Sequence, residues 1–253
     1  MIVLAIGDII GRPGRRVVAE LLPALKKQYR PDLILANAEN AAGGFGLSLD
    51  TANELLDTGI NVLTSGNHIW AQKDILPYLD SEMPILRPLN YPPGVPGRGY
   101  IVTKAAVVIS LMGRTFMTDI DCPFRAMDAL LPTLDSKLVI VDFHAEATSE
   151  KMAMGHYLDG RVSAVLGTHT HVATADARVL SGGTAYISDM GMAGPVNSII
   201  GDDSRGVIQR FLTGIPVRLT VAKGRAMLNA VVTEIDDKSG RAISIKSIRE
   251  EEA

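Results

Sequence analysis

The sequence predicts an α/β or α+β layered sandwich. Units of strand, loop and helix fill the first two thirds of the chain, and segments that alternate like hairpin strands close it. Hydrophobic residues make up 47% of the 253 residues and aromatic residues only 5%, so a substantial and mostly aliphatic core is expected. No internal repeat, low-complexity stretch or boundary is apparent, and we therefore expect a single domain over residues 1–253.

Short apolar runs that stop at glycine or polar residues predict the buried strands of the first half. These strands are expected at residues 2–6, 33–36, 60–63 and 85–86. Apolar residues at helical spacing predict a helix over residues 15–28, although Pro23 lies inside it. Ser48 is a suitable cap for a second helix that closes near Gly59, and a short helix is expected through Leu76.

The second half continues in the same way and ends as a meander. Its strands are expected at residues 100–103, 106–111, 138–141, 162–166, 217–221, 227–235 and 242–248. Its helices are expected at residues 124–131, 149–158 and 205–212. Ser149 is the expected cap of the middle helix, and Gly160 lies just past its end.

Charge and cysteine content narrow the class of partner. The formal net charge is -3 and no long basic run occurs, which argues against a stable complex with duplex nucleic acid. The single cysteine, Cys122, cannot form an intramolecular disulfide and fits a reducing compartment. The apolar start of the chain lacks the basic residues of a signal peptide and is far shorter than the roughly 20 residues of a membrane helix. We therefore expect a cytoplasmic protein with no membrane partner.

Five of the predicted strands end in side chains that commonly bind metal ions. Side chains beyond the carboxyl ends of strands in an open α/β sheet can converge on one site. Four of the five histidines of the chain lie at such ends, and the exception, His156, is expected to be structural or exposed. The converging residues are Asp8, Glu39, Asn40, Asn67, His68, His144, His169 and His171.

This mixture of ligand types predicts a two-metal site. Imidazole with carboxylate suits zinc, iron, manganese or cobalt better than calcium or magnesium. The residues are too many for one tetrahedral ion, whereas two ions about 3.5–4 Å apart would use them all and share one carboxylate. Such a site attracts phosphate oxygens and converts a bound water into a nucleophile near neutral pH. The sequence therefore predicts metal-dependent hydrolysis of phosphate esters, with a small nucleotide or phosphodiester as substrate.

The order of these motifs resembles the calcineurin-like metallophosphoesterases. Gly-Asp at 7–8, Gly-Asn-His at 66–68, the lone His144 and the Gly-Thr-His-Thr-His segment at 167–171 match the superfamily pattern. Two departures are informative: Ile10 stands where a histidine is usual, and the segment 37–40 replaces the usual Gly-Asp-x-x-Asp. With these departures the chain resembles the YmdB family. The segments that carry the likeness are residues 7–15, 37–44, 64–70, 142–151 and 186–192.

The resemblance implies the fold, the cofactors and the substrate class. It implies a four-layer αββα sandwich of the metallophosphoesterase type and phosphodiesterase activity that includes 2′,3′-cyclic nucleotides. It also implies two divalent or mixed-valence metal ions per chain, with iron or manganese favoured and zinc compatible. A homo-oligomer, either a dimer or a tetramer, is expected on the same ground.

The resemblance also assigns a role to each site residue. Glu39 would bridge the two metal ions, and His68 would protonate the leaving oxygen or stabilise the developing charge. A hydroxide held between the ions would attack phosphorus in line with the leaving group. The ligands of the first ion would be Asp8, Asn40 and His171, and those of the second Asn67, His144 and His169.

Several alternatives stay open. Arg12, Arg15 and Arg16 could contact a phosphate or could simply begin a solvated helix. Asp142 and Asp189 could hold ligand imidazoles. The chain could also be a dimetal hydrolase or phosphatase with another substrate, or a regulatory binding protein with a dimetal site. The presence of His68 argues against the last, because a structural metal site has no use for an imidazole that binds no metal.

Overall fold

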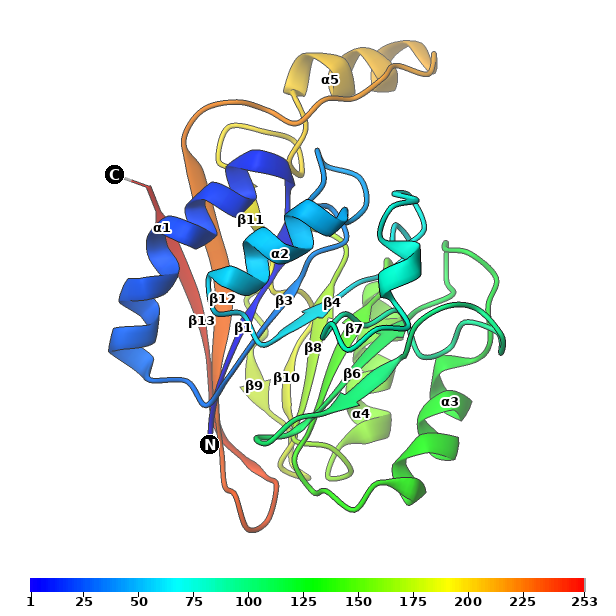
Figure 1. Cartoon of the computed structure of the whole chain (residues 1–253), viewed down its shortest axis with the longest axis vertical. Coiled ribbons are helices and arrows are strands. Elements are labelled where there is room, and N and C mark those ends of the chain that lie inside the picture. The colour runs from blue at the N-terminus through cyan, green and yellow to red at the C-terminus, as the bar shows by residue number, and fades with distance from the viewer. Residues whose placement is uncertain (253) are drawn as a thin grey trace.

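Two β-sheets packed face to face form the centre of the protein, and the computed structural model describes residues 1–252 (Figure 1). In the first sheet the strand order is β2 (Asp8–Ile9), β11 (Met192–Pro195), β12 (Ala226–Ile235), β1 (Ile2–Ile6), β3 (Leu33–Asn37) and β4 (Val62–Thr64), and β13 (Ala242–Glu251) pairs with β12. In the second sheet it is β5 (Tyr100–Val102), β6 (Val107–Met112), β7 (Val139–His144), β8 (Ala164–Thr168), β10 (Ala185–Ile187) and β9 (Arg178–Val179).

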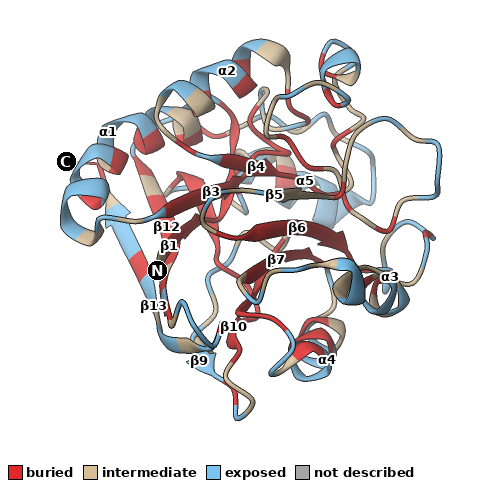
Figure 2. Ribbon diagram, turned by 60° about the horizontal axis from the view of Figure 1, so that its bottom comes forward, coloured by how far each residue is buried: buried red, intermediate tan, exposed pale blue. Residues whose placement is uncertain are grey.

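Helices cover both outer faces and give a four-layer arrangement, which confirms the predicted sandwich (Figure 2). The helices α1 (Gly11–Tyr29) and α2 (Leu49–Asp57) pack on the first sheet. The helices α3 (Pro123–Leu130) and α4 (Thr148–Leu158) pack on the second. Two short 3₁₀ segments, Leu76–Tyr78 and Leu131–Thr133, complete the regular structure together with α5 (Ser204–Thr213), which projects from the body of the molecule (Figure 1).

The central strands are apolar throughout because both of their faces are buried. In β1, Leu4 and Ile6 pack toward the helices, while Val3 and Ala5 pack between the sheets. In the second sheet, Val139 and Val141 face the α3 and α4 layer, and Ile140 faces the first sheet. The strands β1, β3 and β4 run parallel, as do β6, β7, β8 and β10, so their carboxyl ends lie at the same edge of each sheet.

Local sequence signals placed most elements correctly. Ser48 caps α2 as predicted, since its hydroxyl accepts from the Thr51 amide at 3.3 Å and its own amide donates to the Thr51 hydroxyl at 3.0 Å. The helix predicted over residues 15–28 exists and begins at Gly11, and it runs through Pro23. Cys122 is a free, half-buried cysteine that precedes α3, and His156 is exposed on α4.

Three predicted features are wrong. Residues 85–86 form only isolated bridges, to Leu63 and Arg98, and are not a strand. Ser149 does not cap α4: the helix begins one residue earlier, and Ala147 stands at the cap position without a side-chain bond. The segment 217–221 is not a strand, because apart from a single bridge between Val221 and Asp202 it has no neighbouring strand to pair with. The sequence analysis also missed four short strands, β2, β9, β10 and β11. Among residues 1–252, no helix is long and apolar enough to cross a bilayer.

Candidate active site

All eight predicted site residues lie together at the carboxyl edge of the two sheets. Asp8 begins β2, directly after β1, and Glu39 and Asn40 follow β3. Asn67 and His68 follow β4, while His144 ends β7 and the other two histidines follow β8. Neighbouring strands deliver these side chains to one place, which is the convergence that the strand-end pattern predicts.

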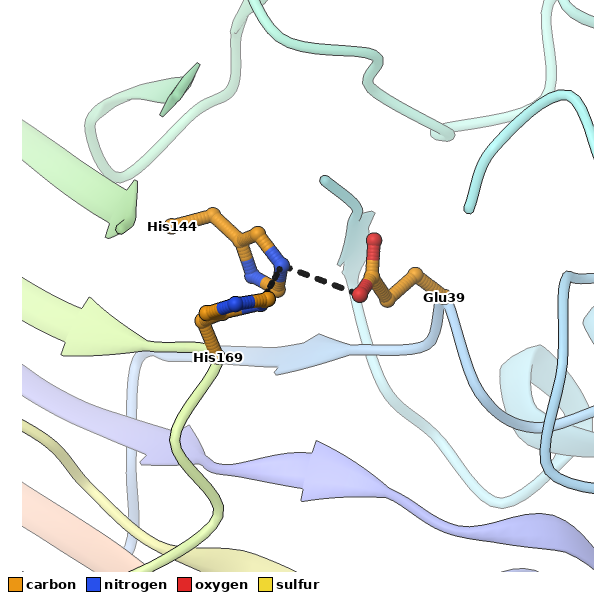
Figure 3. A group of neighbouring side chains, drawn as sticks. All are labelled: Glu39, His144 and His169. Carbon is orange, nitrogen blue, oxygen red and sulfur yellow. Dashed lines mark hydrogen bonds and ion pairs between the residues drawn. The ribbon is translucent and has the colours of Figure 1, made fainter. Parts of the chain in front are cut away.

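Glu39, His144 and His169 form the centre of the site and point at one another (Figure 3). The Glu39 Oε1 atom lies 2.9 Å from the His144 Nε2 atom, and the His169 Nδ1 atom lies 2.9 Å from the same nitrogen. The Asn67 Oδ1 atom lies 3.1 Å from it as well. Three ligand-type atoms therefore surround one imidazole nitrogen, as ligands of a shared cation do.

The second group consists of Asp8, Asn40 and His171. The His171 Nε2 atom lies 3.6 Å from the Asp8 Oδ1 atom and 3.3 Å from the Asn40 Nδ2 atom. The His171 Nδ1 atom donates to the Ile200 carbonyl at 2.7 Å, so its Nε2 atom is left with a free lone pair toward the two partners. This arrangement matches the ligand set that the resemblance implies for a first ion.

Buried oxygens without hydrogen-bond donors show that the residues fit a cation. Within residues 1–252 only three buried side-chain polar atoms lack a hydrogen-bond partner, and two of them are Asp8 Oδ1 and Glu39 Oε1. An unsatisfied buried carboxylate oxygen is costly, so two in one site call for positive charge there. In the ion-free protein the charged His144, 2.9 Å from Glu39 Oε1, supplies part of that charge, and a metal ion would take its place. The described site can therefore hold a divalent cation.

The pKa values report the same concentration of negative charge. Burial raises the pKa of Asp8 to about 6. Burial opposes ionisation of Glu39, but attraction to His144 and His68 prevails and holds its pKa at about 2. Burial likewise disfavours the charged form of His144, yet Glu39 and Asp8 raise its pKa to about 9. Burial and the charge of His144 lower the pKa of His169 to about 3.

A buried hydroxyl and carboxylate orient His144. The Thr168 hydroxyl lies 3.0 Å from the His144 Nδ1 atom and donates to Asp142 at 2.6 Å, so it must accept from the imidazole. Asp142 also accepts from the Thr64 hydroxyl and from the Asn37 amide. The predicted carboxylate support for an imidazole thus exists, but it acts through Thr168 rather than directly.

A buried ion pair anchors the segment that carries the last two histidines. Lys151 donates to Asp189 at 2.7 Å, and both side chains are buried. Asp189 in turn accepts from the backbone amide of Thr170 at 3.0 Å and from its hydroxyl at 2.8 Å. The residues on either side, His169 and His171, have φ values of 98° and 64°, a strained conformation that the anchor maintains. Sequence reasoning missed Lys151 because its charge gave no sign that it was buried.

Glu146 is an acidic residue outside the predicted set that contacts a site histidine. Its Oε2 atom is 3.0 Å from the His169 Nε2 atom, which leaves the Nδ1 atom of that imidazole facing His144. Glu150, in contrast, accepts from the backbone amides of Arg114 and Thr115 and so caps a loop. Glu146 therefore orients an imidazole from a half-exposed position.

His68 lies at the rim, beside the two groups rather than within them. Its Nδ1 atom is 2.8 Å from the Asn40 Oδ1 atom and 3.5 Å from the Glu39 Oε1 atom, and its backbone amide donates to Glu39 at 3.0 Å. The Phe45 ring packs against it with centroids 4.3 Å apart. Burial lowers the pKa of His68, although 28% of the side chain remains exposed. An imidazole in this position can reach a substrate.

A cavity of about 650 Å³ opens beside these residues. Its wall includes Phe45, His68, His171, Leu219, Val221 and Arg210, the last from α5. The volume lies within the roughly 300–1,000 Å³ of small-molecule sites. Arg210 and Phe45 escaped the sequence analysis, because neither adjoins a strand end.

Only one of the three predicted arginines is free for a ligand. Arg15 donates to Glu54 at 2.6 Å and to the Ala41 carbonyl at 2.5 Å, so it fastens the loop after β3. Arg16 is paired with Glu252 at 2.7 Å. Arg12 is exposed and forms no ion pair within residues 1–252.

Comparison with known proteins finds relatives over the whole chain. The family model described as YmdB-like protein matches residues 4–248. The 2′,3′-cyclic-nucleotide 2′-phosphodiesterase of Bacillus subtilis (strain 168) is 47% identical over 254 residues, which cover 98% of this chain and 96% of that protein. A crystal structure of a hypothetical protein from Thermus thermophilus superposes with a TM-score of 0.94 at 45% identity and covers 100% of both chains. The crystal structure of a phosphatase from Mycoplasma pneumoniae gives a TM-score of 0.94 at 36% identity, covering 99% of this chain and 93% of the other.

Proposed function

This chain belongs to the YmdB-like family and is a phosphodiesterase, and from that premise we propose that it hydrolyses 2′,3′-cyclic nucleotides with two metal ions. One observation carries the proposal. Asp8 and Glu39 each keep a buried oxygen without a donor, and these oxygens face the imidazoles of His144 and His171. The cyclic-nucleotide substrate follows from the activity of the Bacillus subtilis relative and from a cavity large enough for a nucleotide.

The seven ligand residues divide into two sets around Glu39. Asp8, Asn40 and His171 would hold one ion, while Asn67, His144 and His169 would hold the other. Glu39 would serve both ions. Its Oε1 atom lies 2.9 Å from His144 of the second set and 3.5 Å from His68, the imidazole that would bind no metal. Iron or manganese suits this mixture of imidazole, carboxylate and amide, and zinc is also compatible. When bound, such ions neutralise phosphoryl oxygens and activate water.

Asn40 connects the metal set to His68. If its Oδ1 atom turns toward Asp8 and His171 as a ligand, its Nδ2 atom faces the His68 Nδ1 atom at the present contact of 2.8 Å. The amide then donates to Nδ1 and keeps the imidazole proton on Nε2. Burial lowers the pKa of His68 and so favours the neutral imidazole, whose Nε2–H can then donate to the leaving oxygen.

The reaction consumes one water. Its oxygen bonds to phosphorus, one P–O ester bond of the cyclic phosphate breaks, and the released ribose oxygen receives a proton through His68. The proton that the water loses restores the one that His68 gives up, so the imidazole ends as it began. The product is a phosphate monoester with a free hydroxyl on the neighbouring ribose carbon.

A homo-oligomer remains part of the proposal. The helix α5 projects from the body, and Phe211 and Leu212 on it are 84% and 80% exposed (Figure 1). Exposed apolar residues of this size commonly mark an interaction surface. A second copy of the chain would cover them, and light scattering of the purified protein measures the state directly. The cytoplasmic location likewise stays a prediction.

The first test is hydrolysis of 2′,3′-cyclic AMP with the metal content measured on the same sample. We expect near two ions per chain and loss of turnover on chelation. Two ions without turnover on this or on generic phosphodiesters would point to another substrate or to a binding role. A protein that takes up no metal even after supplementation would contradict the two-metal proposal.

Replacement of His68 separates an enzyme from a binding protein. In His68→Ala we expect the metal content to survive and hydrolysis to fall by about 10²–10⁴-fold, the range for a general acid. His156→Ala is the matched control, since His156 is exposed on α4 and should leave both unchanged. Full turnover in His68→Ala would remove His68 from the mechanism.

A further inference from the structure

A second cavity, of about 440 Å³, adjoins the catalytic cavity. It lies between the start of α1 and the turn before β12, and Arg12, Arg16 and Lys223 line it. Gly43 and Val221 line both cavities, so the two spaces are separated by one glycine and one valine side chain. A ligand that extends past Gly43 and Val221 would therefore have one end in each cavity.

The second cavity has unbalanced positive charge. Arg16 is neutralised by Glu252, through bonds of 2.7 and 2.8 Å. Arg12 and Lys223 are exposed, and neither has a carboxylate within ion-pair distance among residues 1–252. Arg16 also donates to the Gly224 carbonyl at 2.9 Å, which fixes the turn that carries Lys223. Two free cations on a fixed frame are suited to a phosphate.

The boundary between the cavities is formed by two glycines of the loop after β3 and by the Val221 side chain. Gly44 has φ of +93°, and a Cβ atom there would lie 2.5 Å from the Val221 side chain. Gly43 has φ of +69°, and a Cβ atom there would meet nothing within 4 Å. The loop after β3 therefore lies against Val221 at Gly44 and leaves open space at Gly43, which lines both cavities.

Resting on the proposed function, we propose that the enzyme acts on nucleotides with a 2′,3′-cyclic phosphate and a second phosphate on the 5′ oxygen, which Arg12 and Lys223 bind. The cyclic phosphate occupies the catalytic cavity beside His68. The cyclic phosphate uses both the 2′ and the 3′ oxygen, so the 5′ oxygen is the only remaining ribose oxygen that can carry a second phosphate. It can be a terminal 5′-phosphate or the linkage to a preceding nucleotide, as at the 3′ end of a short single-stranded RNA.

The test compares kcat/KM for three substrates with the metal-loaded protein. They are 2′,3′-cyclic AMP, its 5′-phosphorylated form, and the dinucleotide adenylyl-adenosine with a terminal 2′,3′-cyclic phosphate. We expect the two substrates with a second phosphate to be preferred by about tenfold, the order for one charge-assisted contact. The preference should shrink with added salt, because phosphate contacts displace counterions. Preference for the dinucleotide alone would identify the internucleotide linkage as the ligand.

Variants separate this site from the catalytic one. In the double variant Arg12→Ala, Lys223→Ala, we expect kcat/KM for the two longer substrates to fall about tenfold further than for 2′,3′-cyclic AMP. Lys27→Ala, which removes a charge from the other end of α1, should change none of the three. Equal rates on all substrates, or equal losses in the double variant, would overturn the inference while leaving the proposed function standing. Failure to hydrolyse any of the three with both metals bound would overturn both.

Discussion

The two sheets bring different chemistry to the same site. The first sheet supplies the candidate oxygen ligands, Asp8, Glu39 and the two asparagines, and the second supplies the candidate nitrogen ligands, three histidines. In the proposed ligand sets each metal ion would take residues from both sheets, because each set combines asparagine with histidine. The site therefore exists only where the apolar layer between the sheets, built from residues such as Val3 and Leu166, holds the two edges together.

The two halves of the site are also supported differently. In the first sheet, backbone groups hold the ligands: the His68 amide donates to Glu39, and the Glu39 amide donates to the Asn37 side chain at 3.2 Å. In the second sheet, buried side chains hold the candidate ligands. Thr168 and Asp142 orient His144, and Asp189 holds the loop after β8 that carries the other two histidines. Residues outside the ligand set should consequently matter more in the second half.

The largest effect is expected from Glu39, where the two halves meet. Glu39→Gln keeps the shape but removes the charge that faces His144 and His68. We expect loss of bound metal and turnover reduced to background, because an amide cannot bridge two cations as a carboxylate does. Elemental analysis and 2′,3′-cyclic AMP hydrolysis measure the two effects, with Glu82→Gln, an exposed site, as control. Full metal content in Glu39→Gln would show that the halves do not depend on this carboxylate.

The next largest effect is expected from Gly66, where the first sheet's loop contacts the second sheet's histidine. A Cβ atom at Gly66 would lie 2.0 Å from His144 Cδ2 and 2.4 Å from its Nε2 atom. Gly66→Ala must push the imidazole aside, and a displacement near 1 Å can cost about 10²-fold in rate. Gly206→Ala is the control, since its nearest neighbour would be at 3.6 Å. Wild-type turnover in Gly66→Ala would mean that the imidazole position tolerates a shift.

Gly66 also shows how far sequence reasoning reached. The strand-end pattern identified every ligand candidate, because parallel strands force their carboxyl ends together and the polar residues after each strand are readable directly. It could not identify residues that act across the sheets. Gly66, Thr168 and Lys151 look like an ordinary turn, strand and helix residue, and only the packing of one sheet on the other gives them partners.

The same limit explains the errors in the fold. The strands β2 and β11 contain only two and four residues. They exist because β11 pairs with both β12 and β2, which no local pattern shows. The segment 217–221 alternates like a strand but lacks a partner beyond one bridge. Strand identity depends on neighbours more than helix identity does, so the helices were predicted better than the short strands.

A smaller effect is expected from Thr168, the support specific to the second half. Thr168→Val keeps the shape and removes the hydroxyl between His144 and Asp142. We expect metal affinity to weaken by about 10–100-fold, as for other residues that orient a ligand. Thr64→Val is the matched control, because Thr64 also donates to Asp142 but does not touch His144. Both variants should lose stability, by about 1–3 kcal/mol for the lost donor to a buried carboxylate. Equal metal affinities in the two would contradict the orienting role of Thr168.

The smallest effect is the proton that metal uptake should release. At pH 7.5 in the ion-free protein, His144 with a pKa of about 9 is protonated, whereas His169 with a pKa of about 3 is neutral. Because the pKa of His144 is raised on folding, its proton stabilises the ion-free protein fully below about pH 6.5, and this stability is lost as the pH rises through 9. A metal ion requires the neutral imidazole, so the affinity of the protein for metal should rise as the pH increases from about 6.5 to 9.

Titration calorimetry in buffers of different ionisation enthalpy measures this release. We expect about one proton per chain at pH 7.5 and close to none at pH 9.5. His169→Asn, which removes a histidine that is already neutral, should leave the number unchanged if metal still binds to the remaining ligands. A release near zero at pH 7.5 would mean that His144 is neutral beside Glu39. The oxygen ligands of the first sheet would then lack the opposing charge that the second sheet is inferred to provide before metal binds.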